Sequence, residues 1–190
     1  MLGVKVSCLR EQYNIDRVAV LLTVLCLVVM LLVGCESGER LPKEGGMILS
    51  VSSTAFQEGS RIPSKYTCQW SEPPEGTQSL ALIMDDPDAP SGVFTHWVLF
   101  NISSDSRKLP EAVPTQAQLP SGALQGKNDF GRIGYGGPCP PPGRPHRYRF
   151  TLYALDQPSD LKAGASKKQV LDAIQGHILA QGQLTGMYQR

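Results

Sequence analysis

The stretch Ser79–Gly92, SLALIMDDPDAPSG, decides the class of fold, because an apolar run ends in three carboxylates and two prolines. Alternate side chains of a β-strand share a face, so the even-numbered residues from Leu80 to Asp86 form one row. Asp86 therefore ends a core-facing row, where a carboxylate needs polar partners. The prolines restrain the chain just beyond it. Asp85 or Asp88 can instead cap the turn as an Asx motif, and for Asp85 we favour that interpretation.

Two further strands begin with a histidine on an apolar row. In THWVLFNI (Thr95–Ile102), His96 is in line with Val98, Phe100 and Ile102. In PHRYRFTLYALD (Pro145–Asp156), His146 is in line with Tyr148. Each histidine alone is typical of a structural residue. If the three strands are neighbours, however, their polar ends line one small pocket.

The rest of the chain predicts a mainly β domain with many turns. Its 15 prolines and 19 glycines lie between short β-branched and aromatic runs. One helix is expected, because Ser166 and Gln169 form a capping box ahead of apolar residues at helical spacing. The expected strands are Ile48–Ser52, Ser79–Asp86, Thr95–Ile102, Arg147–Ala154 and Gln183–Tyr188.

Residues 1–34 have the pattern of a secretory signal. Three basic residues precede an apolar run from Val18 to Val33, which is shorter than the ~20 residues of a membrane-spanning helix. The alternative is a permanent N-terminal anchor helix, and both interpretations place the folded part outside the cytoplasm. Residues 35–46 are polar and predict a flexible tether, which leaves 47–190 as the folded domain.

The end of this segment, LVGC (Leu32–Cys35), resembles the lipobox of bacterial lipoproteins. That resemblance implies that Cys35 carries lipid, such as palmitate, after the preceding peptide is removed. It further implies a membrane partner and a location in the bacterial cell envelope, on the periplasmic side in a Gram-negative cell.

Charge argues against a nucleic-acid partner. The whole chain has 18 basic and 17 acidic residues, and residues 1–34 hold three and two of them, so 15 of each remain. A neutral domain without a basic stripe lacks the electrostatic footprint of a nucleic-acid-binding protein.

Two cysteines remain in the predicted domain, Cys68 and Cys139. In an oxidising compartment such a pair suggests one disulfide. A metal site is the weaker alternative, since neither cysteine has a second ligand at CxxC spacing.

Four motifs in chain order resemble the phosphatidylethanolamine-binding protein family, and most closely its bacterial, Raf kinase inhibitor-like branch. The similarity runs from Met47 to Tyr188. It implies an antiparallel Greek-key β-sandwich with a few peripheral short helices and a small anion pocket at one end. The motifs are DPDAP (Asp86–Pro90), THWVLFNI, the segment Asn128–Asp156 and GHILAQGQLTGMY (Gly176–Tyr188).

Carried over by residue, the resemblance assigns ligand binding to Asp86, Asp88, His96, His146, Tyr148, Gly137 and Pro140. This sequence departs from the family between Cys68 and Trp70, where a segment that usually contributes a strand and a turn is missing. We therefore expect an altered sheet edge or pocket rim.

The function expected from these features is non-enzymatic binding of a small anionic or phosphorylated group. The group can belong to a phospholipid head group, a phosphomonoester or a protein partner. No catalytic residue, cofactor or metal is assigned. One alternative is a protease or kinase inhibitor, and a less favoured one is a metal-dependent hydrolase, for which no HExxH or GxSxG motif is found.

Overall fold

The computed structural model describes residues 47–63 and 66–190. The predicted signal segment, the lipidation of Cys35 and the tether lie outside the described residues.

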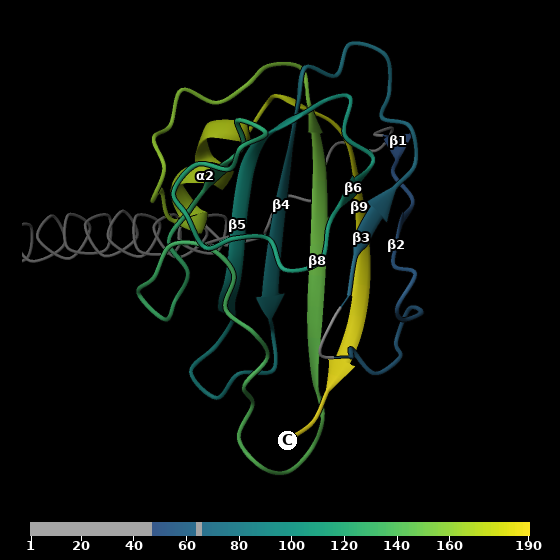
Figure 1. Cartoon of the computed structure of the whole chain (residues 1–190), viewed down its shortest axis with the longest axis vertical. Coiled ribbons are helices and arrows are strands. Elements are labelled where there is room, and N and C mark those ends of the chain that lie inside the picture. Colours follow the sequence, from purple (N-terminus) through teal and green to yellow (C-terminus); the bar gives the residue numbers. More distant parts are fainter. Residues whose placement is uncertain (1–46, 64–65) are drawn as a thin grey trace, which may run out of the picture. The chain divides into compact units, whose positions relative to one another are not determined.

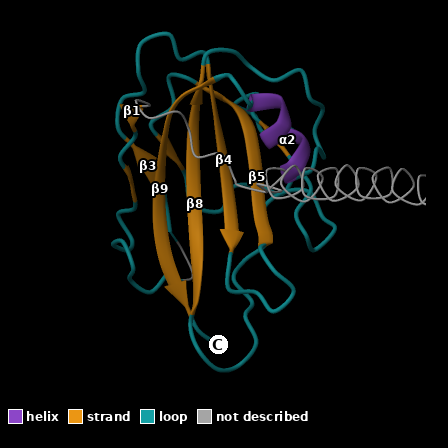
Figure 2. Ribbon diagram, turned by 180° about the vertical axis from the view of Figure 1, so that it is seen from behind, coloured by secondary structure: helices purple, strands orange, loops and turns teal. Residues whose placement is uncertain are grey.

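Two β-sheets and one short helix, α2 (Lys167–Ile174), make up the described part of the chain (Figures 1 and 2). The larger sheet has six strands in the order β1-β9-β8-β4-β5-β7, and the smaller has three in the order β2-β3-β6. All neighbours are antiparallel except β1 and β9, which are parallel. No helix in residues 47–63 and 66–190 has both the length and the apolar character needed to cross a bilayer. The strands are β1 (Met47–Ile48), β2 (Val51–Ser52), β3 (Cys68–Trp70), β4 (Ser79–Asp86), β5 (Phe94–Ser103), β6 (Lys108–Leu109), β7 (Leu124–Gln125), β8 (His146–Leu155) and β9 (Ile178–Tyr188).

The mainly β fold and the single capped helix are confirmed. Strand β4 has the predicted bounds, and α2 begins after the predicted capping box of Ser166 and Gln169. Strand β9 begins at Ile178, ahead of the predicted start. The strands β3, β6 and β7 were not predicted, because two or three residues are too few to show a period.

The first predicted strand, Ile48–Ser52, divides between the two sheets. Met47 and Ile48 pair with β9, whereas Val51 and Ser52 pair with β3. Leu49 crosses closely over β9, and its carbonyl oxygen lies 2.0 Å from where a Cβ at Gly182 would stand. Only glycine at this position allows the crossing.

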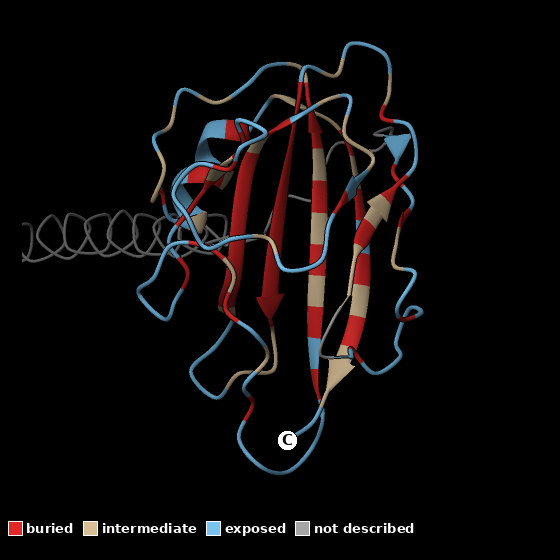
Figure 3. Ribbon diagram, in the orientation of Figure 1, coloured by how far each residue is buried: buried red, intermediate tan, exposed pale blue. Residues whose placement is uncertain are grey.

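The core has two clusters, one on each face of the larger sheet. The main cluster contains Leu80, Leu82 and Met84, as the alternation along β4 predicts. The second lies on the side of α2, which buries Val170 and Ile174 there. Figure 3 shows that β4 is buried along its length. Burying one such aliphatic side chain stabilises the fold by about 1.5–3 kcal/mol.

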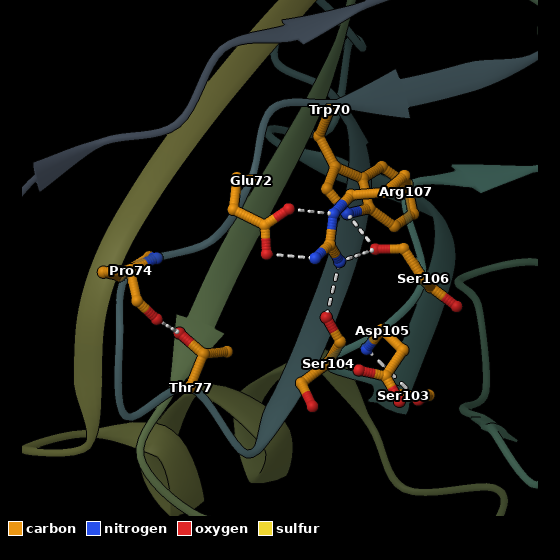
Figure 4. A network of polar contacts seen from close by, with 9 residues as sticks. All are labelled: Trp70, Glu72, Pro74, Thr77, Ser103, Ser104, Asp105, Ser106 and Arg107. Carbon is orange, nitrogen blue, oxygen red and sulfur yellow. Dashed lines mark hydrogen bonds and ion pairs between the residues drawn. The ribbon is translucent and has the colours of Figure 1, made fainter.

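Strand β3 is the middle strand of the smaller sheet and not an edge. The segment expected to be missing between Cys68 and Trp70 stays a prediction. Polar contacts tie the end of β3 to the turn before β6 (Figure 4). The Trp70 indole donates to the Ser106 carbonyl oxygen at 2.8 Å, and the Arg107 guanidinium donates to the Glu72 carboxylate. The short sheet is thus fixed by side chains as well as by its few ladder bonds.

The disulfide suggested by the cysteine count is not formed, because Cys68 and Cys139 are both free. Cys68 lies in the main core cluster, where burial raises the pKa of its thiol to about 12. Cys139 is exposed in the loop before β8.

Candidate anion-binding site

The ends of three neighbouring strands meet at one end of the larger sheet. Strand β4 lies between β5 and β8, so its last residues stand beside the first residues of both neighbours (Figure 1). Asp86 is opposite Phe94 in β5, and Asp85 is opposite Arg149 in β8. The prediction that these strands are neighbours is confirmed.

A β-bulge brings His96 into this group. Across one step of β4, from Met84 to Asp85, the partner in β5 moves two residues, from Trp97 to Thr95. The extra residue is His96, and a bulge of this kind re-aims its side chain. Its ring lies 5.1 Å from that of Tyr148, which belongs to the main core cluster.

The predicted row of His96, Val98 and Phe100 is therefore wrong. Val98 and Phe100 face the cluster beneath α2, on the opposite side of the larger sheet. The convergence of His96 with Asp86 depends on the bulge, not on regular alternation.

Asp86 is the centre of the site. Its Oδ2 accepts a hydrogen bond from His146 Nδ1 at 2.7 Å, and its Oδ1 accepts one from the Asp88 backbone N–H at 2.8 Å. The second bond is an Asx turn, so this turn belongs to Asp86, and the interpretation that gave it to Asp85 is wrong. Asp85 instead pairs with Lys167 Nζ at 2.7 Å.

His96 is held by a backbone carbonyl group. Its Nδ1 lies 2.8 Å from the Gly136 carbonyl oxygen, so Nδ1 carries the proton of the neutral ring. Burial lowers the pKa of His96 below 6.5, although the Gly136 and Gly137 carbonyl groups and the Asp86 carboxylate oppose the shift. The aromatic rings of Phe94 and Phe130 also pack against the imidazole.

Tyr148 supplies a buried hydroxyl group that completes no hydrogen bond within the described residues, although the Asp86 carboxylate and the Cys139 backbone lie near it. Burial, together with the nearby Asp86 carboxylate, raises the pKa of this phenol, so it stays protonated at neutral pH. Leaving a buried hydroxyl group unpaired destabilises a folded protein by roughly 1–3 kcal/mol. A ligand that accepts a hydrogen bond from this group would remove that cost. The exposed fractions are 3% for Asp86, 3% for His96, 5% for His146 and 0% for Tyr148.

Asp88 lies next to this cluster, but Arg147 occupies its carboxylate. Oδ2 accepts from the Arg147 backbone N–H and from Nε, both at 2.9 Å, and Oδ1 accepts from Nη2 at 2.8 Å. The guanidinium holds the pKa of Asp88 well below its usual range. This contact attaches the elbow after β4 to the beginning of β8 and so positions Asp86 and His146.

The loop before β8 forms one side of the site. Gly137 is exposed and its backbone lies near the His96 ring, whereas Pro140 is buried and has no recorded polar contact with the cluster in the described part of the chain. Gly136, which the sequence interpretation did not single out, bonds His96 through both backbone groups. A Cβ at Gly136 would lie 2.6 Å from the Phe130 ring. In the sequence, only the adjacent glycines Gly136 and Gly137 indicate that the backbone approaches other groups closely here.

The site can donate hydrogen bonds to an anion. Both Nδ1 atoms are engaged, so each Nε2 donates only when its ring is an imidazolium. Charge-assisted bonds from these rings and the Tyr148 hydroxyl suit a phosphate or carboxylate oxygen. Within residues 47–63 and 66–190, no three or more His, Cys, Asp or Glu side chains are grouped as potential metal ligands.

The chain is similar in sequence to known proteins. Residues 52–189 match the sequence pattern of the family described as phosphatidylethanolamine-binding protein. A UPF0098 protein of Methanothermobacter thermautotrophicus is 52% identical over 75% of this chain and 99% of its own length. Another from Aquifex aeolicus is 49% identical over 80% of this chain and 94% of its own.

Two crystal structures have the same fold. Escherichia coli YbcL, described as a new member of the mammalian PEBP family, is 31% identical with a TM-score of 0.69 and covers 76% of this chain and 99% of its own. A phosphatidylethanolamine-binding protein homologue from Chlamydia trachomatis is 36% identical with a TM-score of 0.68 over 75% of this chain and 98% of its own.

Proposed function

The chain belongs to the phosphatidylethanolamine-binding protein family, and from this premise we propose that it is a non-enzymatic module that binds a phosphate-bearing or other small anionic group. The observation that supports this most directly is the unpartnered, fully buried hydroxyl of Tyr148 beside His96 and Asp86. A folded protein seldom leaves such a group unpaired without a functional reason.

Each side chain has a distinct role in the proposed complex. His96 and His146 donate hydrogen bonds from Nε2 to the anion when they are protonated, and Tyr148 donates one from its hydroxyl group. Asp86 orients His146 and can accept a hydrogen bond from a protonated ligand oxygen or an ammonium group. Asp88 acts as a positioning residue through Arg147, and Gly137 and Pro140 shape the loop beside the site.

The proposed location is the outer side of a bacterial membrane. The support is the lipobox resemblance at Leu32–Cys35 and the polar segment that follows it. Replacing Cys35 with serine should move the protein from the membrane to the soluble envelope fraction, as measured by fractionation and metabolic labelling with palmitate. Unchanged membrane association without lipid incorporation would favour the anchor helix instead.

Isothermal titration of the purified full chain with inorganic phosphate tests the binding function. We expect binding at pH 6 that weakens at pH 8, and roughly tenfold weaker binding in His96→Ala and His146→Ala. His177→Ala is the control, because that imidazole pairs with Asp156 away from the cluster. Phosphate affinity that is the same at both pH values, or the same in all variants, would contradict the proposal.

Different probes distinguish the kinds of molecule that can carry the anionic group. Phosphoethanolamine, nucleotides, a phosphoserine peptide and vesicles containing phosphatidylethanolamine present the same chemistry on different carriers. Metal analysis of the same protein tests the hydrolase alternative, which a stoichiometric divalent ion would favour.

A further inference from the structure

A second pocket lies at the same end of the larger sheet. It has a volume of about 340 Å³ and is lined by Arg61, Pro145, Met187, Tyr188, Gln189 and Arg190. These residues come from the segment before β3, the start of β8 and the end of β9. In Figures 1 and 2 the C-terminal end of the chain lies beside the loop that leads into β8.

Tyr188 lines this pocket and adjoins residues of the anion site. It is opposite His146 in the β8–β9 ladder, and residues opposite each other in an antiparallel pair share a face about 5 Å apart. Its ring also makes an edge contact with that of Tyr148, with centroids 6.5 Å apart. Tyr188 therefore connects the pocket to the residues of the anion site.

Hydrogen bonds hold the pocket against the loop beside the anion site. Gln189 Nε2 donates to the Gly143 carbonyl oxygen at 2.6 Å, and Arg190 Nη1 lies 3.9 Å from Cys139 Sγ. On the other side, Ile62 N–H donates to the Met187 carbonyl oxygen at 2.8 Å, which positions Arg61 beside β9. The same loop thus contacts both spaces.

Two arginine side chains and an apolar surface line the pocket. Arg61 and Arg190 are its charged members, it has no acidic lining residue, and neither guanidinium forms an ion pair within the described residues. Pro145, Met187 and the Tyr188 ring provide the apolar surface. A guanidinium pair above such a surface suits an anionic group carried on a short hydrocarbon linker.

We propose that the pocket is a second anion subsite, so that the ligand of the proposed binding function carries two anionic groups joined by a short linker. The first group occupies the site of Asp86, His96, His146 and Tyr148. The second contacts Arg61 and Arg190 across Tyr188. This inference rests on the proposed function, and it favours a doubly anionic ligand over a zwitterion such as phosphoethanolamine, whose ammonium group the two arginines repel.

A series of matched probes tests the inference. Alkylphosphonates and the ω-phosphonoalkanoates of the same chain length differ only in a terminal carboxylate. The full chain is titrated with both series, at chain lengths from two to eight carbons. At one length, the ω-phosphonoalkanoate should bind about tenfold more tightly than the matching alkylphosphonate. Arg61→Gln and Arg190→Gln should each reduce that gain, and the double variant should abolish it, while affinity for inorganic phosphate stays within about twofold of the wild type.

Arg132→Gln is the matched control. Arg132 stacks over Phe130, which contacts His96, so it is close to the anion site without lining the second pocket. Equal loss of the carboxylate gain in this control would show a general charge effect and overturn the inference. So would a terminal carboxylate that adds nothing at any length. If wild-type protein binds neither phosphate nor any phosphonate, the proposed function itself fails.

Discussion

Asp86 explains the acidic elbow that follows β4. One carboxylate oxygen fixes the turn through the Asp88 N–H, and the other orients His146. A buried carboxylate is costly unless it has such partners. The prolines that follow restrict the backbone of the turn in which Asp86 makes both hydrogen bonds. The elbow therefore positions the residues of the site.

His96 gives the protein a pH-dependent stability. Its pKa is lowered by burial, so between its native pKa and 6.5 the unfolded state binds more protons than the folded state. The free energy of unfolding of the ligand-free protein should therefore fall as pH decreases below 6.5. His96→Gln should flatten this part of the profile, measured by urea unfolding at pH 5 to 8.

His177→Gln is the matched control, because His177 is only partly buried and pairs with Asp156 at the surface. If His96→Gln leaves the slope of stability with pH unchanged, the buried imidazole is not responsible for it. Phosphate should oppose the acid destabilisation, since bound anion stabilises the imidazolium form.

At the scale of single elements, β4 and α2 could be predicted because their signals are local. A continuous apolar run that ends in acidic residues and a capping box are read directly from the chain. The two irregularities of β5 could not be predicted in the same way. Asn101, with φ of 53°, has a residue type that tolerates this conformation and exchanges hydrogen bonds with Ser159. His96 has no comparable signal, because its bulge is set by pairing with β4.

The loop before β8 supports His96 through Gly136. Gly136→Ala should destabilise the protein by about 1–3 kcal/mol and weaken phosphate binding, because the added Cβ meets the Phe130 ring at 2.6 Å. Gly137→Ala is the comparison, since a Cβ there meets only Tyr135, at an ordinary 3.8 Å. Chemical denaturation and phosphate titration measure both effects. Equal losses in the two variants would show that general loop rigidity, and not the fit of Gly136, supports His96.

At the scale of the whole molecule, the sandwich and the cluster of polar strand ends could be anticipated, but for different reasons. Composition and alternation predict β-structure, whereas the neighbouring positions of β4, β5 and β8 came from the family resemblance. The free Cys68 and Cys139 could not be predicted, since a cysteine count contains no information on distance. The second pocket was also missed, because Arg61 and Arg190 are far apart in the chain and meet only through the end of β9.

The central claim is that one anion binds at His96 and His146. The chain has three histidines, so nitrogen-detected NMR of a ¹⁵N-histidine-labelled sample reports every imidazole. On titration with inorganic phosphate at pH 6, the Nε2 signals of His96 and His146 should shift together with one dissociation constant while His177 stays constant. Equal shifts at all three histidines, or none at His96 and His146, would contradict the claim.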